Sequence, residues 1–203
     1  MDDKEYLKHI SSTVRPQKAP NTGFTSSPLF KVILFGVIGL ILIIVLGSFL
    51  GGSGDGKTKL ASLQLHLDNT SELISVYQKS IKSSDLRSTS ASLYSVLTNT
   101  SREVEDFLKT NYKLTVNSLE KTVKDQATQS KDELDAELLE AKINGLLDRV
   151  FVLKIKYEIS AFMAEETDIY NSTSNESLQT IIGSSYSSLS TLYDKLDSFS
   201  ETK

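Results

Sequence analysis

The chain has 203 residues, no cysteine and a formal net charge of −4 at pH 7. The absence of cysteine excludes disulfides, thiolate catalysis and a lipidated cysteine anchor. The first 31 residues carry five basic and three acidic side chains, so they contribute +2 and the remaining residues contribute −6. An acidic main portion argues against a nucleic-acid partner, because phosphates bind basic surfaces.

The N-terminal segment, residues 1–28, contains all three prolines of the chain, Pro16, Pro20 and Pro28, among Ser, Thr, Lys and Asn. This composition buries too little apolar surface to offset the entropy of ordering. The segment is predicted to be a disordered cytoplasmic tail.

An apolar run follows, and residues 29–50 are predicted to form a single transmembrane helix. No charged residue occurs from Val32 to Leu50, and nineteen helical residues span roughly 28 Å, close to the thickness of a bilayer core. A cleaved secretory signal is the alternative, since Gly51 and Ser53 resemble a cleavage site. The long polar segment before the run favours an uncleaved anchor.

The distribution of basic residues predicts the orientation of this helix. Five cations lie on its N-terminal side, the last of them Lys31 within its first turn, whereas only Lys57 and Lys59 occur in the first twenty residues after it. The positive-inside rule then places the N-terminus in the cytoplasm and the C-terminal domain outside. We therefore expect a single-pass protein of the plasma membrane, with the membrane as an integral partner.

Small residues within the run suggest a packing surface. Gly39, Gly47 and Gly51 fall on one helical ridge, and the last two form a G-x-x-x-G pair that lets two helices approach closely. Self-association through this ridge is one predicted interaction.

Gly23-Phe24-Thr25, just before the run, resembles the processing site of type IV prepilins. This resemblance implies a pilin-like subunit. Pro28 stands where such pilins carry a glutamate, and the apolar helix of a pilin begins sooner after the site. A pilin-like role is therefore a lesser alternative.

Residues 51–56, GGSGDG, read as a flexible glycine-rich linker, and residues 57–203 read as one helical domain. From Lys57 onward there is no proline and there are only two glycines, Gly145 and Gly183, whereas a β protein needs many turn residues. The fold class predicted is all-α.

Apolar residues recur in this domain at alternating steps of three and four, which is the pattern of a helix with one buried face. Four such stripes run from Leu60 to Ile81, Leu86 to Phe107, Leu134 to Phe162 and Leu178 to Phe199. The third stripe predicts one long helix beginning near Ser130, preceded by a short helix over 117–128. The average spacing predicts an antiparallel four-helix bundle.

Catalytic motifs are absent from the sequence of this domain. It has one histidine, His66, whose nearest acid lies on a different helical face, so we interpret it as a solvated surface residue. The acidic run from Asp132 to Glu140 resembles a cation site, but acids also favour the first turns of a helix. We expect no cofactor, no metal and no enzymatic activity.

Two stripe positions carry unsuitable residues, Gly145 and Asp148, because glycine weakens a helix and a lone buried carboxylate is costly. A close helix contact at Gly145 and a pairing of Asp148 or Glu140 with an arginine would compensate. The sequence therefore predicts a buried polar layer or partner site, formed by Arg87, Arg102, Glu140, Asn144, Gly145, Asp148 and Arg149.

These features together predict a membrane-anchored, extracytoplasmic helical bundle that acts as a non-enzymatic interaction or structural module of the cell envelope. Its partner is an unknown protein or a second copy of the chain. The alternative is a small-molecule sensor with a ligand bound around Asp148 and Arg149. A metal-dependent enzyme is a lesser alternative.

Overall fold

Residues 56–201 are described by a computed structural model, with the side chains of the last two left out. Within this range the chain forms five α-helices and two short 3-10 helices and no strand, which confirms the all-α class. The helices are α3 (Gly56–Tyr77), α4 (Ser84–Tyr112), α5 (Lys121–Ile143), α6 (Leu147–Ser172) and α7 (Glu176–Glu201), and the 3-10 helices are η2 (Gln78–Ser80) and η3 (Val116–Ser118).

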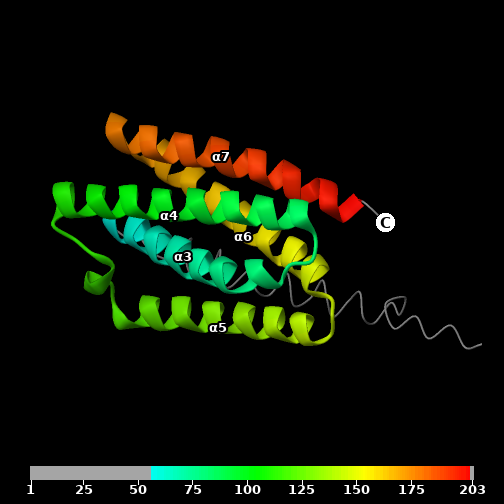
Figure 1. Cartoon of the computed structure of the whole chain (residues 1–203). Coiled ribbons are helices and arrows are strands. Elements are labelled where there is room, and N and C mark those ends of the chain that lie inside the picture. Colours follow the sequence, from blue (N-terminus) through cyan, green and yellow to red (C-terminus); the bar gives the residue numbers. More distant parts are fainter. Residues whose placement is uncertain (1–55, 202–203) are drawn as a thin grey trace, which may run out of the picture. The chain divides into compact units, whose positions relative to one another are not determined.

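Four of the helices form a ring in which α3 packs against α4, α4 against α7, α7 against α6 and α6 against α3. Neighbours in this ring run in opposite directions (Figure 1). The fifth helix, α5, packs on α3 and α6 from outside the ring. The predicted four-helix bundle is therefore wrong in helix number, because the described part of the chain adds α5 to such a bundle.

The predicted apolar stripes form the core. Every member of the first two stripes is buried, including the polar residues Thr70, Ser90 and Thr100. The largest fully buried side chains are Phe151 and Phe162 of α6. Removal of all the core side chains from water is the main favourable contribution to folding. It amounts to roughly 25 cal/mol per Å² of apolar surface buried.

The long third helix predicted from Ser130 onward is wrong, because a turn at residues 144–146 divides it into α5 and α6. Gly145 has φ +72°, the left-handed conformation that ends many helices. The Leu146 N–H donates to the Ala141 carbonyl at 2.8 Å, and the Gly145 N–H to the Lys142 carbonyl at 3.2 Å. This pair of bonds is the Schellman motif, so Gly145 is a helix terminator and makes no close helix contact.

The separate short helix predicted over 117–128 is wrong in both bounds. Residues 116–118 form η3, and α5 begins at Lys121 and continues without a break through Ser130 to Ile143. At the start of α7 the Leu178 N–H donates to Asn175 Oδ1 at 3.1 Å. Asn175 is thus the N-terminal capping residue of α7.

The helices of residues 56–201 include none that is long and apolar enough to cross a membrane. The predicted tail over 1–28 and transmembrane helix over 29–50 lie outside the described residues. The same is true of Gly39, Gly47 and Gly51. Of the predicted linker over 51–56, only Gly56 is described, and it is the first residue of α3.

Candidate functional site

The predicted site residue Asp148 binds the connection between α3 and α4. Its Oδ1 accepts a hydrogen bond from the Lys82 N–H at 3.0 Å, and its Oδ2 accepts one from the Ser83 N–H at 2.8 Å. Ser83 itself caps α4, because its Oγ accepts a bond from the Leu86 N–H at 3.2 Å. The carboxylate of Asp148 therefore fixes the start of α6 against the start of α4.

Arg87 binds the same connection from α4. Its Nε and Nη2 both donate to the Ile81 carbonyl, at 3.2 and 2.6 Å. Arg87 and Asp148 therefore lie in one region, where each bonds to the backbone of residues 81–83 in place of the direct pairing that was predicted. Both side chains act as structural clamps on that loop.

The rest of the predicted site does not form a buried polar layer. Glu140, Asn144, Gly145 and Arg149 are exposed at the turn between α5 and α6. Arg102 is exposed farther along α4, about 22 Å from Arg87 at 1.5 Å per residue, and its Nη2 donates to Asn99 Oδ1 at 3.1 Å. The expected layer fails because the apolar stripe passes through a turn, and turn residues face water.

A small recess does lie at this turn, with a volume of about 270 Å³. It includes Gly145, Asp148 and Arg149 of the predicted site, and Lys82 and Lys142 add two further cations. Both oxygens of Asp148 accept backbone N–H groups, and the other charged residues that line the recess are basic. The recess is below the usual size of small-molecule pockets.

The α5–α6 hairpin also carries large apolar side chains that face water. Ile143 is 76% exposed, Leu153 60% and Leu146 54%, and Leu139 is exposed as well. Isolated exposed apolar residues are common, but four within 15 residues of one hairpin are a concentration of the kind seen at interaction sites. Residues 139–153 are called the hairpin tip below.

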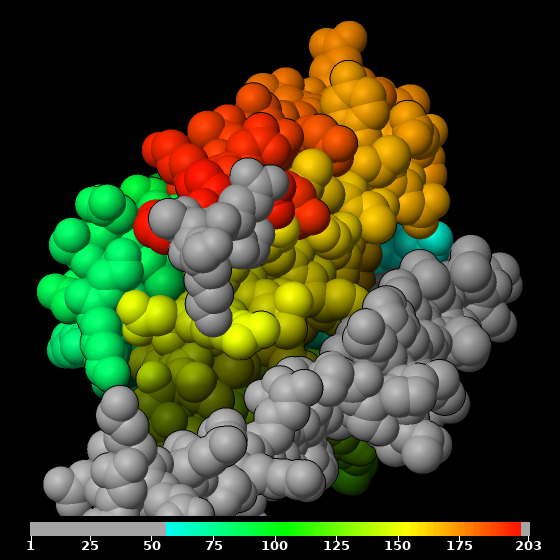
Figure 2. All heavy atoms as spheres, turned by 90° about the vertical axis from the view of Figure 1, so that its right-hand side faces the viewer, coloured from blue at the N-terminus to red at the C-terminus, as the bar shows by residue number. Residues whose placement is uncertain are grey.

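Figure 2 views the end of the molecule that carries the hairpin tip. The start of α6 lies near the middle of this face, with the start of α4 on one side and the end of α7 above it. Figure 1 shows that the turn between α5 and α6 lies at the end of the bundle opposite the start of α3.

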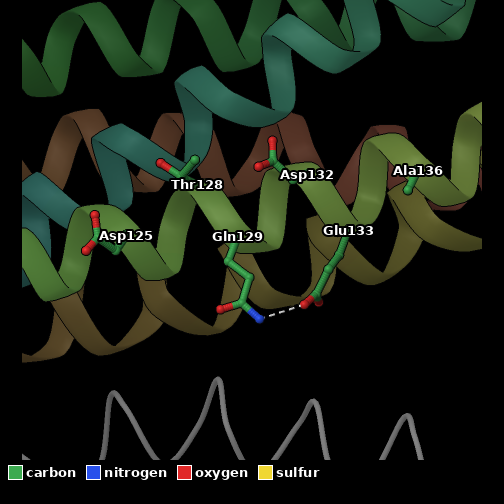
Figure 3. Close-up of a pocket in the computed structure, with 6 residues that line it drawn as sticks. All are labelled: Asp125, Thr128, Gln129, Asp132, Glu133 and Ala136. Atoms are coloured by element: carbon green, nitrogen blue, oxygen red, sulfur yellow. Dashed lines mark hydrogen bonds between the residues drawn. The ribbon is translucent and has the colours of Figure 1, made fainter.

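Figure 3 shows an exposed face of α5, formed by Asp125, Thr128, Gln129, Asp132, Glu133 and Ala136. On this face Gln129 Nε2 donates to Glu133 Oε1 at 2.8 Å. The acidic run continues around α5, where Asp135 accepts a bond from Tyr77 Oη at 2.8 Å and Glu137 pairs with Lys154. Within 56–201 no group of three potential ligands is placed to hold a metal ion.

The core of the bundle contains a polar chain that sequence analysis missed. Thr100 Oγ1 of α4 donates to Ser185 Oγ of α7 at 3.0 Å, and Ser185 Oγ donates to Glu166 Oε1 of α6 at 2.5 Å. Glu166 is 0% exposed, and burial raises its pKa to about 7. The bond from Ser185 lowers the pKa in part, and the charge of Glu165 raises it.

His66 of α3 lies at the interface with α6, so its interpretation as a solvated surface residue is wrong. Its side chain is 28% exposed, and its Nδ1 lies 3.7 Å from Glu165 Oε1. Burial lowers the pKa of His66, but Glu165 and Glu158 outweigh that effect and raise it overall. Burial also raises the pKa of Glu158 to about 7. The positive charges of His66 and Lys154 lower this pKa, and the negative charges of Glu165 and Glu137 raise it.

A partial signal for the core chain was present in the sequence. Thr100 and Ser185 occupy stripe positions, and Glu166 continues the stripe of α6 four residues after Phe162. The pattern identifies buried positions, but it does not tell which stripes meet at one level. The contact of His66 with α6 has no local signal, because its partners lie more than ninety residues away.

No family model matches the chain, and no curated protein or solved structure is significantly similar to it.

Proposed function

We propose that this chain is a membrane-anchored, non-enzymatic interaction module of the cell envelope, and that the hairpin tip binds a protein partner. The single observation that carries this proposal is the group of exposed apolar side chains at one end of the bundle, above all Ile143 and Leu146. Burying such side chains in a partner removes them from water, which is the main driving force of protein association.

The charges around the tip indicate the chemistry of the partner. Lys82, Lys142 and Arg149 line the recess beside Leu146. An apolar patch with basic neighbours is complementary to a protein surface that has an apolar cavity and acidic residues at its rim. Charges at a rim chiefly set the rate and specificity of association, so salt should slow the binding.

The anchor is the part of the proposal that depends on sequence alone. The uncharged run from Val32 to Leu50 supports a single-pass helix, and the excess of cations before it supports an N-terminus in the cytoplasm. The bundle would then face the outside, and the tip would lie at its end away from Gly56.

In-cell photo-crosslinking of the full chain tests the proposal. A photoreactive residue at position 143 or 146 should give a discrete adduct with an acidic-surfaced protein, and Lys142→Glu combined with Arg149→Glu should abolish it. A photoreactive residue at Tyr94, which is 38% exposed on α4, is the matched control and should give no such adduct. Equal adducts from all three positions would overturn the tip as the binding surface, and an adduct with the chain itself would replace the foreign partner by self-association.

A further inference from the structure

We propose that the bundle contains a proton-linked switch, in which the core carboxyl of Glu166 must be neutral for α4, α6 and α7 to pack tightly. This inference concerns the regulation of the fold and does not depend on the proposed partner. It begins with the position of Glu166, which is fully buried where these three helices meet.

The hydrogen bonds around Glu166 leave one carboxyl oxygen without a donor. Thr100 and Ser185 have one hydroxyl proton each, and both protons are used in the chain that ends at Glu166 Oε1. Glu166 Oε2 is buried and has no hydrogen-bond partner among the described residues. A proton on the carboxyl group itself would remove the negative charge that this site leaves unsatisfied.

No counter-ion offsets an ionised Glu166 in the described part of the chain. Among the described residues, the ion pairs of α6 with its neighbours are His66 with Glu165, Lys59 with Asp168, Lys154 with Glu137 and Lys156 with Asp197. None of them includes Glu166. The nearby charge that acts on it is the like charge of Glu165 on α6, while α4 and α7 face it with the hydroxyls of Thr100 and Ser185. An ionised Glu166 would therefore be a buried, unpaired charge.

The α3–α6 interface beside this site responds to protons in the same direction. His66 of α3 faces Glu158 and Glu165 of α6, and Glu158 is in turn influenced by Lys154 and by Glu137 of α5. Protonation of His66 converts its contact with Glu165 into an ion pair, and protonation of the half-buried Glu158 removes a charge that desolvation disfavours. Proton uptake thus tightens α3, α4, α6 and α7 together.

The direction of the pH effect follows from comparing folded and unfolded chains. An unfolded Glu166 ionises at its ordinary pKa of 4.5, whereas the folded one holds its proton up to about 7. Unfolding between these values releases a proton, so stability falls as pH rises from 4.5 to 7. The raised pKa of His66 adds stability that is complete below 6.5 and is lost as pH rises through the folded value.

Urea unfolding of the full chain in a mild detergent, followed by helical circular dichroism at pH 5.5 and 8.5, tests the switch. The unfolding equilibrium constant of the wild type should rise at least about tenfold between these pH values. Glu166→Gln should make that rise clearly smaller, because the amide has the same shape and no charge, while the contributions of His66 and Glu158 remain. Glu103→Gln, an exposed change on α4, should leave the rise intact.

Two results would overturn the proposal. One is a wild type whose stability is unchanged or greater at pH 8.5, and the other is a Glu166→Gln variant that keeps the full pH dependence. If Glu166→Gln does not fold, Ser185→Ala decides the question. Ser185→Ala removes the hydrogen bond that lowers the pKa of Glu166, so the fall of the unfolding free energy with pH should extend to a higher pH than in the wild type. An unchanged or lower pH at which this fall ends would reject the switch.

Discussion

Single residues carry most of the difference between the expected and the observed site. Gly145 and Asp148 were correctly identified as unusual positions, because neither residue suits the buried face of a helix. The chain turns at this point. The apolar pattern did not show the turn, because the buried positions of α6 continue the three-and-four spacing of α5. The bonds of Asp148 to residues 82 and 83 join parts of the chain 65 and 66 residues apart, so no local pattern reports them.

Replacing Gly145 by alanine distinguishes a turn from a helix interior, because the free energy of unfolding should change in opposite directions in the two cases. In a helix interior Gly→Ala stabilises by up to about 1 kcal/mol, but a left-handed residue with a Cβ costs roughly 1–2 kcal/mol. No atom lies within 4 Å of a Cβ built at Gly145, so crowding does not contribute. We expect Gly145→Ala to destabilise the chain in urea unfolding.

Gly145→Asn is the matched control for that measurement, because asparagine tolerates the left-handed conformation better than alanine. Its loss of stability should be smaller. A stabilising Gly145→Ala would mean that α5 and α6 form one helix in solution.

At the scale of elements, α5 differs from the four helices of the ring. Only four of its 23 residues are buried, whereas α3 buries eleven of 22. In the first half of α5, Ala127 is the one buried residue. Three polar contacts from α3 support it. Asn69 Nδ2 donates to the Ala127 carbonyl at 3.2 Å, Tyr77 donates to Asp135, and Glu72 pairs with Lys131 at 2.6 Å. Because its core contact is small, α5 should open before the ring does.

Hydrogen exchange followed by mass spectrometry checks this expectation in the full chain. Amides of α5 should exchange faster than those of α3 and α4 at pH 7, with the first half of α5 fastest. Leu138→Ala removes a fully buried side chain and should widen the difference, while Leu139→Ala, at an exposed neighbour, should not. Uniform exchange across all five helices would show that α5 unfolds only with the whole bundle.

At the scale of the whole molecule, the helical class and the buried face of each helix were predictable from the sequence. The first two stripes were correct at every position because helical period and burial are local properties of a sequence. The ring order of the helices and the polar chain at Glu166 were not predictable. They depend on contacts between residues far apart in the sequence, such as Thr100 with Ser185, which are 85 positions apart.

The orientation proposed for the whole chain has its own test. An epitope tag fused after Lys203 should be labelled by antibody on intact cells, because the cation excess before residue 32 favours an N-terminus inside. A tag fused before Met1 serves as the control and should be labelled only after the membrane is permeabilised. The reverse labelling pattern would place the bundle in the cytoplasm.

The path of the chain through the bundle also has a mechanical consequence. The chain enters at Gly56, and the hairpin tip lies at the opposite end (Figure 1). A pull between an anchored N-terminus and a partner on the tip would therefore act along the helix axes. Such tension shears α3 against α4, α5 and α6 at once and loads their contacts in parallel. A sideways pull on the tip would instead peel α5 away first, so the bundle should hold a load best along its own axis.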